Sequence, residues 1–444
     1  MRRNPRGLSV QVKETLIQKG LAKRMDQLAK GTAVPPSVRH HTMPESHIRF
    51  DRQPGYQQVR LMQEGAQRLG VESPFFHVHE GTASARSTIG TQETINYGSY
   101  NYLNLSGHPT VNAAAKAAID RYGTSVSASR IVAGERPLHR ELENLIARTY
   151  EVDDALVMVS GHATNISVIS HLLGPNDMVL HDEYAHNSIL LGIQLAGAQR
   201  LSFRHNDLES LAQTLRRHRH QVERLLIVVE GLYSMDGDFP DLPTLVALKK
   251  QYGAWLMVDE AHSFGVLGRQ GLGIREHFHT DPHDVDIWMG TLSKTLAACG
   301  GFVAGEHALI ENLRYLAPGF LYSVGISPPV AAAATAALQI LRSEPQRVAA
   351  LHARGAYFLE RIRSLGLNPG YSTGLAITPV IIGSSLESVR ISAALLKQGI
   401  HVQPILYPAV PERQARLRFF LSSAHSVEDI DKTMAALKNA LSHP

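Results

Sequence analysis

The stretch WLMVDEAHSFG, residues 255–265, contains the pattern that decides the fold of this 444-residue chain. An apolar run at 255–258 has the length of a buried strand, and the polar residues Asp259 and His262 follow it. A carboxylate at the end of a buried strand needs a partner, because an unpaired buried charge is costly. A pyridinium nitrogen is a suitable partner, since the carboxylate keeps such a ring protonated, and His262 could donate to the ring's phenolic oxygen. The alternative is a structural Asp–His pair that caps a helix.

A second motif, GTLSKT at 290–295, follows another apolar run, and its Lys294 lies 35 residues after Asp259. Lys294 in this position can form an imine with an aldehyde cofactor and later move protons as a base. Thr291 and Ser293 offer hydroxyl groups to a phosphate. A surface lysine is the alternative for this motif alone. The spacing favours a site, because both Asp259 and Lys294 follow strand-like runs and could reach one crevice.

Short apolar runs alternate with helical patterns over most of the chain. Such runs are typical of strands buried on both faces, and their alternation with helices predicts an α/β fold with a mainly parallel sheet. After about residue 330 an Ala-rich helix leads into short strands mixed with helices, which indicates a smaller C-terminal α/β domain. The other runs lie at 155–159, 178–180, 225–229, 287–289, 302–304, 380–382 and 417–421.

Three further motifs follow or contain strand-like runs. SGHATN at 160–165 resembles a strand-to-helix turn, whose backbone N–H groups can bind phosphate. In HDEYAHNS, His186 could stack on a planar ring. In ARLRF, alternation places Arg416 and Arg418 on one face of a strand, where one of them can hold a carboxylate bidentately. An ordinary helix cap, a structural histidine and an interface arginine are the respective alternatives.

Composition limits the class of protein. The chain is 44% hydrophobic and 19% charged, and it lacks an apolar run near the roughly 20 residues of a membrane span. Its basic N-terminus has no apolar segment with a small-residue cleavage site, so we expect no secretion signal. The one cysteine, Cys299, has no internal partner, and this fits a reduced, cytoplasmic setting.

The basic charge is concentrated in residues 1–30, where eight Lys and Arg face only Glu14 and Asp26, a net of +6. A solvated helix face at 8–28 is one interpretation, and a docking arm for an acidic partner or an anionic surface is another. Nucleic acid is not indicated, because no aromatic residues alternate with these charges. Residues 31–56 are rich in Pro, His and Arg, so we predict an extended arm there.

Taken in order, the motifs resemble the α-oxoamine synthases, a family of pyridoxal-phosphate enzymes. The resemblance begins near residue 74 and implies the type I transferase fold, a homodimer with shared active sites, and pyridoxal 5'-phosphate as cofactor. It also implies that an amino acid condenses with an acyl thioester, with loss of CO2. The stretches that carry it are NYLNLSGHP (101–109), RYGTSVSASR and AGERPLHRELE (121–143), SGHATN, HDEYAHNS, EGLYSMDGD (230–238), VDEAHSFGVLG (258–268), GTLSK and ARLRF.

The resemblance also implies a role for each matching residue. For the reaction and for contact with the cofactor ring it implies Lys294 as the Schiff-base lysine, Asp259 at the ring nitrogen, His262 at the phenolic oxygen, His186 stacked on the ring and Ser234 beside it. For the phosphate it implies Ser160, Gly161, His162 and Thr291. For the substrate it implies Arg416 on the amino-acid carboxylate, with Asn101 and Arg130 nearby; it implies no metal.

Three departures from the family pattern stand out. Ala185 precedes His186 where many relatives have Asn. Val324 and Gly325 replace a Thr-Ser pair that reaches the partner's phosphate, so a backbone N–H of Gly325 would make that contact. The stretch 122–135 looks more like the synthases of polyketide and fatty-acid assembly lines, which favours an acyl carrier protein over CoA.

Rival interpretations remain at this stage. One is an aminotransferase or another type I pyridoxal-phosphate enzyme. Another is a catalytically silent partner subunit, but such subunits lack the lysine and this chain has Lys294. A zinc site is disfavoured, because arginines surround His218 and His220. We predict three segments: a basic N-terminal helix and extended arm at 1–73, a large pyridoxal-phosphate-binding domain at 74–330 and a small domain at 331–444.

Overall fold

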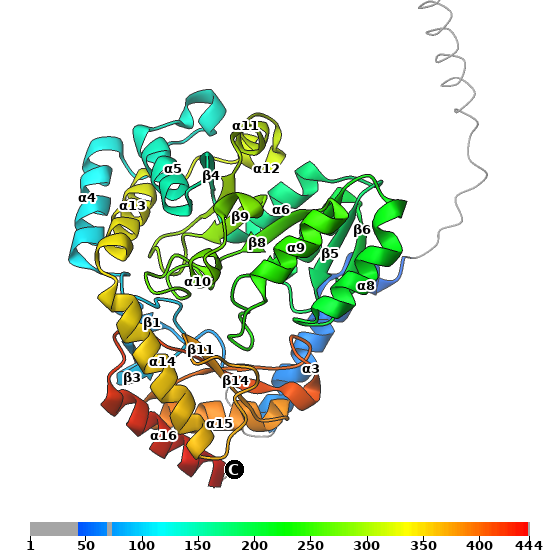
Figure 1. The fold of residues 1–444 in the computed structure, drawn as a ribbon. Coiled ribbons are helices and arrows are strands. Elements are labelled where there is room, and N and C mark those ends of the chain that lie inside the picture. The colour runs from blue at the N-terminus through cyan, green and yellow to red at the C-terminus, as the bar shows by residue number, and fades with distance from the viewer. Residues whose placement is uncertain (1–42, 69–72, 443–444) are drawn as a thin grey trace, which may run out of the picture. The chain divides into compact units, whose positions relative to one another are not determined.

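The computed structural model describes residues 43–68 and 73–442 (Figure 1). The chain divides into two compact units, one up to residue 70 and one from residue 71 onward. The predicted helix at 8–28 and the basic arm at 1–30 lie outside the described residues.

The N-terminal unit is helical where we expected an extended arm. It contains α2 (Glu45–Ile48), the 3-10 turn η1 (Phe50–Arg52) and α3 (Pro54–Arg68). The prediction of an extended segment as far as residue 56 was therefore wrong. Pro54 starts α3 rather than preventing it, because the first position of a helix needs no backbone N–H and its φ suits proline.

The second unit contains a seven-stranded sheet in the order β4-β10-β9-β8-β7-β5-β6. The pairs from β9 through β6 are parallel, and β10 pairs antiparallel with both β4 and β9. This confirms the predicted mainly parallel sheet. The strands are β4 (Asp154–Met158), β5 (Met178–Asp182), β6 (Gln199–Phe203), β7 (Leu225–Glu230), β8 (Trp255–Asp259), β9 (Ile287–Thr291) and β10 (Gly301–Gly305).

Helices cover both faces of this sheet (Figure 1). Alternate residues of β7 show the pattern: Ile227 and Val229 join one apolar core, whereas Leu226 and Val228 join the other. The first core is formed with α4 (Pro109–Tyr122), α5 (Pro137–Tyr150), α8 (Leu208–His218), α9 (Leu242–Tyr252) and α13 (Pro328–Ser343). The second is formed with α6 (Gly161–Leu172), α7 (Asn187–Ala196), α11 (His307–Leu316) and α12 (Pro318–Leu321). A short helix, α10 (Ile274–Phe278), follows β8.

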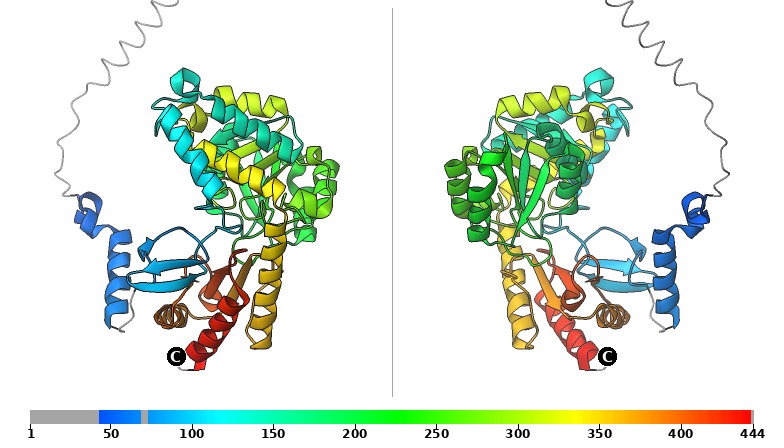
Figure 2. Two further views of the ribbon diagram at one scale, coloured as in Figure 1. Left: turned by 90° about the vertical axis from the view of Figure 1, so that its left-hand side faces the viewer. Right: turned by 90° about the vertical axis from the view of Figure 1, so that its right-hand side faces the viewer.

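Two smaller sheets lie with the C-terminal helices (Figure 2). One consists of β11 (Ile377–Ile381), β14 (Arg416–Phe420) and β13 (Gln403–Ile405). The other joins β1 (His79–Glu80), β2 (Arg86–Ile89) and β3 (Gln92–Asn96) to β12 (Ile400–His401), which runs parallel to β3. The helices are α14 (Gln346–Ser364), α15 (Ser385–Lys397) and α16 (Val427–Ser442). The strands of residues 79–96 thus form a sheet with β12 rather than with the large sheet.

Among residues 43–68 and 73–442, none of the helices combines the length and apolar character that crossing a bilayer requires.

Candidate active site

The carboxyl ends of three neighbouring strands bring the predicted site together. Glu230 ends β7, Asp259 ends β8 and Thr291 ends β9, and Glu230 is the register partner of Asp259. Lys294 lies three residues beyond Thr291. Because parallel strands end at one edge of the sheet, side chains far apart in sequence become neighbours there.

Asp259 is held in place by two hydrogen bonds. Nδ2 of Asn165 donates to Oδ2 at 2.8 Å, and the backbone N–H of Ala261 donates to Oδ1 at 2.9 Å. Nδ2 of Asn165 also donates to Oγ of Ser188 at 3.0 Å, and that oxygen lies 2.7 Å from Nδ1 of His186. One polar network therefore positions Asp259, which we predicted at the ring nitrogen, and His186, which we predicted on the ring face.

His262 is buried and neutral. Burial lowers its pKa well below the usual range, and the nearby Lys294 adds to the effect. The Tyr102 hydroxyl lies 2.7 Å from Nδ1 of His262, and burial raises the pKa of Tyr102, so this hydroxyl keeps its proton. In the tautomer in which the hydroxyl donates to Nδ1, the imidazole proton is on Nε2, and Nε2 is then a donor of the kind that a phenolic oxygen requires.

Lys294 has the properties of a reactive amine. Burial lowers its pKa to about 8, although the Asp259 carboxylate opposes the shift. Its Nζ lies 5.7 Å from the ring centre of Tyr100, and both residues line a cavity of about 600 Å³. A lysine with a pKa near neutrality can lose its proton and act as a nucleophile or a base.

The N-terminus of α6 forms a cradle beside Thr291. The Ser160 side chain accepts a hydrogen bond from the N–H of Ala163, and helix geometry leaves the amides of Gly161 and His162 without an intrahelical acceptor. A Cβ on Gly161 would lie 3.0 Å from Oγ1 of Thr291, so glycine lets the two segments approach closely. Such a helix end suits a phosphate.

His186 and Ser234 lie around the same centre. His186 caps α7, with its Nδ1 accepting from the N–H of Ser188 at 3.3 Å. Burial lowers its pKa, and Lys294 and Asp259 both influence it, which places His186 near both groups. The carbonyl of Ser234 accepts from Nη1 of Arg418 at 3.1 Å. The residues predicted for the ring lie at or just beyond the carboxyl ends of β5, β7 and β8. Their carboxylate, imidazole and hydroxyl groups, together with the cradle, are of the kinds that suit pyridoxal phosphate.

Our sequence reasoning missed Glu230 as an individual residue. Its side chain is buried, its Oε1 has no hydrogen-bond partner in the described chain, and burial next to Asp259 raises its pKa to about 8. Glu230 is therefore protonated at neutral pH. The available signal was its position directly after the apolar run at 225–229.

The predicted carboxylate clamp needs correction. Arg416 is 3% exposed, and its Nη1 lies 3.0 Å from both carboxylate oxygens of Asp236. Arg418 lies on the same face, as alternation predicted, and it is close enough to Lys294 to lower that pKa. Within the described chain its buried Nε has no partner. Arg418 is therefore the guanidinium available at the site.

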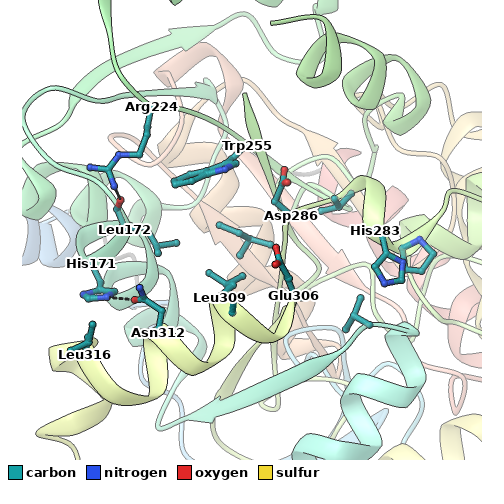
Figure 3. Close-up of a pocket in the computed structure, with 16 residues that line it drawn as sticks. His171, Leu172, Arg224, Trp255, His283, Asp286, Glu306, Leu309, Asn312 and Leu316 are labelled. Carbon is teal, nitrogen blue, oxygen red and sulfur yellow. Dashed lines mark hydrogen bonds between the residues drawn. The ribbon is translucent and has the colours of Figure 1, made fainter. Parts of the chain in front are cut away.

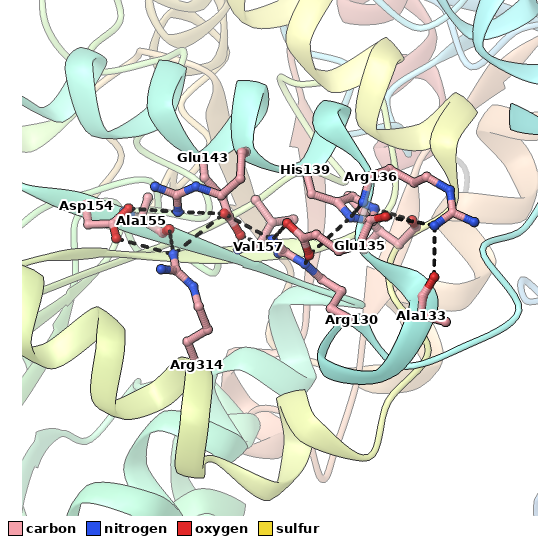
Figure 4. Close-up of polar contacts among 12 residues, drawn as sticks. Arg130, Ala133, Glu135, Arg136, His139, Glu143, Asp154, Ala155, Val157 and Arg314 are labelled. Atoms are coloured by element: carbon pink, nitrogen blue, oxygen red, sulfur yellow. Dashed lines mark hydrogen bonds and ion pairs between the residues drawn. The ribbon is translucent and has the colours of Figure 1, made fainter. Parts of the chain in front are cut away.

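The guanidinium of Arg130 is likewise paired with carboxylates of this chain (Figure 4). Its Nε donates to Glu135 at 2.5 Å, and its Nη1 and Nη2 donate to the fully buried Glu143. Glu143 accepts in addition from the backbone of Val157 and from Arg140. With its charge neutralised in this network, Arg130 stabilises the loop before α5, and its contact with substrate stays a prediction.

Gly325 and Asn101, two other predicted site residues, also make hydrogen bonds within this chain. The N–H of Gly325 donates to the carbonyl of Ala128 at 3.1 Å, so the predicted contact of this amide with a partner's phosphate is not supported. Oδ1 of Asn101 accepts from the amides of Leu105 and Ser106, and its Nδ2 donates to Ala83 at 2.7 Å. Asn101 nevertheless lines the Lys294 cavity, with its side chain fixed by the turn it caps.

A second cavity of about 660 Å³ lies at the opposite ends of the parallel strands (Figure 3). Trp255 and Ile287, the first residues of β8 and β9, line it. Its Arg224 pairs with Asp177, and its Asp286 pairs with Lys249. It lacks the strand-end groups described above, so size alone does not identify the site. In the described ranges, no three His, Cys, Asp or Glu side chains are arranged to hold a metal ion.

The doubly covered sheet, with a buried lysine and an aspartate at adjacent strand ends, defines a type I pyridoxal-phosphate enzyme. Residues 92–437 match the family described as aminotransferase class I and II. The chain is 38% identical to 8-amino-7-oxononanoate synthase of Symbiobacterium thermophilum over 372 residues, which covers 84% of this chain and 94% of that protein.

Comparison with solved structures supports the same assignment. The structure of Sphingomonas wittichii serine palmitoyltransferase superimposes with a TM-score of 0.84 at 30% identity, covering 87% of this chain and 97% of that one. A structure of the S. paucimobilis enzyme contains bound pyridoxal phosphate and has a TM-score of 0.83 at 28% identity, with coverage of 87% and 97%. The chain therefore belongs to the α-oxoamine synthase family. It is a pyridoxal-phosphate-dependent acyltransferase that condenses an amino acid with an acyl thioester and releases CO2.

Proposed function

We propose that this enzyme is cytoplasmic, works as a homodimer, and joins a small amino acid to an acyl group carried by an acyl carrier protein, giving an α-amino ketone, CO2 and a free thiol. The observation that carries the site assignment is the juxtaposition of Lys294, Asp259 and His262 at adjacent strand ends. The preference for a carrier protein is supported by the 122–135 stretch and by the basic residues at 1–30.

Each side chain has a defined task in this proposal. Bound pyridoxal phosphate supplies an electron sink for the negative charge that develops at the amino acid's α-carbon. Asp259 would face the ring nitrogen, Nε2 of His262 the phenolic oxygen, and His186 the ring face. Ser160, Gly161, His162 and Thr291 would hold the phosphate, and Ser234 would lie beside the ring. Nζ of Lys294, with its pKa of about 8, takes the α-proton and returns it at the end.

Binding of the amino-acid carboxylate can be used to distinguish the roles of Arg418 and Arg416. We expect Arg418→Lys to raise the KM for the amino acid about 10- to 100-fold, because an ammonium cannot replace the bidentate fork of a charged hydrogen bond. Arg416→Lys should chiefly lower the melting temperature, since it disturbs the buried pair with Asp236. Steady-state kinetics and thermal unfolding of both variants distinguish these effects. A large KM effect for Arg416→Lys alone would restore the original assignment.

A dimer with shared sites is supported by an exposed apolar patch. Val132 is 78% exposed and Tyr322 is 86% exposed, and Ile131 and Val324 are also exposed. A β-bridge between Ser129 and Val324 joins the two segments that carry these residues. Contiguous exposed apolar side chains mark interaction surfaces. A monomeric mass in analytical ultracentrifugation at micromolar concentration would refute the dimer.

The carrier preference is tested with matched acyl donors. We expect the same acyl group to have a lower KM on a carrier protein than on CoA, and the difference to shrink as salt rises, because attraction between exposed charges is screened over about 8 Å at physiological salt. Deleting residues 1–30 should raise the KM for the acyl carrier several-fold and spare CoA donors. Mass spectrometry of the products from an amino-acid panel identifies the second substrate.

A matched control for this experiment keeps the arm but lowers its net charge from +6 to +2, by changing Lys13, Lys19, Lys23 and Arg24 to Gln. It should behave like the deletion if charge is the cause. If the arm instead supports folding, the deletion should damage use of both donors and the Gln variant neither. Equal or better use of acyl-CoA by the intact enzyme would refute the carrier claim and leave the condensation reaction unaffected.

A further inference from the structure

His205 is a histidine that has no part in the roles assigned above. It lies between β6 and α8, and its side chain is 7% exposed. Its Nδ1 lies 2.9 Å from Oδ1 of Asp182, and its Nε2 lies 2.8 Å from Oδ2 of Asp238. Asp182 ends β5, whereas Asp238 belongs to the loop that follows β7. One imidazole therefore joins two segments that are more than 50 residues apart in the sequence.

The two carboxylates require the ring of His205 to be an imidazolium. An ionised carboxylate only accepts hydrogen bonds, and a neutral imidazole has a single N–H, so it could satisfy only one of them. Burial disfavours the charged ring, but the hydrogen bonds with Asp182 and Asp238 raise the pKa of His205 to about 10. At neutral pH both ring nitrogens therefore donate, and the two bonds are charge-assisted.

Two tyrosines contact the same ring from the same two segments. Tyr184, two residues after Asp182, is stacked on the ring of His205 with centroids 4.3 Å apart. Tyr233 meets that ring at an angle of 85°, with centroids 4.5 Å apart. A cation over an aromatic face adds electrostatic attraction to packing. Each segment therefore contacts His205 through one carboxylate and one aromatic ring.

Asn206 adds a neutral link between the two segments. It has a positive φ of 52°, which asparagine adopts more readily than most residues. Its N–H donates to Oδ2 of Asp182 at 2.9 Å, and its Nδ2 donates to Oδ2 of Asp238 at 2.7 Å. In the part of the chain that the structure describes, His205 is the one basic side chain that pairs with either buried carboxylate.

The segment 182–186 determines the position of His186. The N–H of Tyr184 donates to Oδ1 of Asp182 at 2.8 Å, so the side chain that His205 contacts also shapes the turn. His186 follows this turn directly as the cap of α7. A shift of Asp182 would therefore be transmitted to His186.

The segment 233–238 determines the position of Ser234 in the same way. The N–H of Tyr233 donates to the carbonyl of Asp238 at 2.8 Å, which closes this segment into a loop. Within the loop, the carbonyl of Ser234 accepts from Nη1 of Arg418. A shift of Asp238 would therefore move both Ser234 and the carbonyl that Arg418 contacts.

We propose that His205 is a positioning residue for the cofactor site. Its imidazolium holds the segments 182–186 and 233–238 together. It thereby fixes His186 of one segment relative to Ser234 of the other. The inference rests on the proposed function, because it takes these two residues as neighbours of the cofactor ring. Loss of His205 should loosen the site without removing any group that takes part in the reaction.

The test follows the release of pyridoxal phosphate from the holoenzyme after dilution, together with the visible circular dichroism of the cofactor that is still bound. His205→Gln removes the cation and keeps a polar side chain. We expect this variant to release the cofactor about 10-fold faster than the wild type. The dichroism per bound cofactor should also change, because the surroundings of the ring are less fixed. Both are measured well below the melting temperature, so that global unfolding does not contribute.

Arg224→Gln is the matched control. Arg224 pairs at 2.9 Å with the buried Asp177, directly before β5 begins. His205 pairs with Asp182 at the other end of that strand. Both substitutions leave a buried carboxylate without its cation, so both should lower the melting temperature. Only His205→Gln should change cofactor release and dichroism.

A double-mutant cycle with Asp238→Asn tests whether His205 and Asp238 act as one unit. Asp238→Asn alone should also speed release, because an amide oxygen is a weaker acceptor for an imidazolium than a carboxylate is. The double variant restores the net charge that the cluster has in the wild type. It should therefore release the cofactor no faster than His205→Gln alone. Additive effects would mean that the two residues act separately, and the proposal would be wrong.

Two further results would overturn the proposal. One is a release rate of His205→Gln within about twofold of the wild type, and the other is an equal effect of Arg224→Gln. If His205→Gln does not fold, Asp238→Asn decides against the same control. Release and dichroism do not depend on turnover, whereas product analysis and the label on Lys294 test the proposed function. A failure of one can therefore be told from a failure of the other.

Discussion

Replacing Lys294 by Ala will abolish condensation, with a loss of about four orders of magnitude in kcat, because the variant lacks both the amine that carries the cofactor and the base that moves the α-proton. The buried position of Lys294 and its pKa of about 8 suit it to both tasks. The check is single-turnover kinetics of the purified variant after reconstitution with pyridoxal phosphate. Residual activity within tenfold of the wild type would exclude Lys294 as the essential base.

A chemical label provides the control for this prediction. Borohydride reduction of the wild-type holoenzyme should leave a phosphopyridoxyl group on the peptide that contains Lys294, and peptide mass spectrometry will locate it. Lys249, which is paired with Asp286, should stay unlabelled. Recovery of the label on another lysine would mean that the assignment from GTLSK is wrong.

Asp259→Asn should have the second-largest effect, a loss of about 100- to 1000-fold in kcat with the cofactor still bound. A neutral amide cannot hold the ring nitrogen in its protonated form, so the negative charge at the α-carbon is less stabilised. The new amide also presents a donor to either Asn165 or the N–H of Ala261, both of which donate to Asp259. The measurements are kcat and the absorbance spectrum of the bound cofactor.

Glu230→Gln is the matched control for Asp259→Asn. Both residues are buried carboxyls at neighbouring strand ends, but Glu230 has its pKa raised to about 8 and is already neutral at pH 7. Its replacement by an amide should cost far less activity at that pH. Equal losses in the two variants would show that Asp259 acts through packing rather than through charge.

The position of a polar residue in the fold was predicted most accurately where that residue directly follows an apolar run. Asp259 and Lys294 meet for the reason that the pattern implied, since both follow strands of one parallel sheet. The search for continuous apolar runs did not predict β6. This edge strand has mostly exposed residues, and an exposed strand does not need a continuous apolar run. The sequence-based prediction also failed at α3, where proline at a helix start resembled a break in structure.

The arginines show why side-chain partners were harder to predict than strand ends. Period-two alternation placed Arg416 and Arg418 on one face, but Asp236, 180 residues earlier, pairs only with the first. Arg130 and Gly325 likewise have their donors occupied by Glu143 and by the carbonyl of Ala128. Sequence spacing contains no information on which distant acceptor reaches a given donor.

The apolar periodicity of the amino-acid sequence predicted the mainly parallel sheet, and the resemblance of its motifs implied the family and the cofactor, because both signals are local features of the chain. Only the tertiary structure decided that Arg416 rather than Arg418 pairs with a buried carboxylate, and that Glu230 and His262 are neutral. Those properties depend on desolvation and on hydrogen bonds from segments far apart in sequence, and both arise only when the folded chain excludes water and brings those segments into contact.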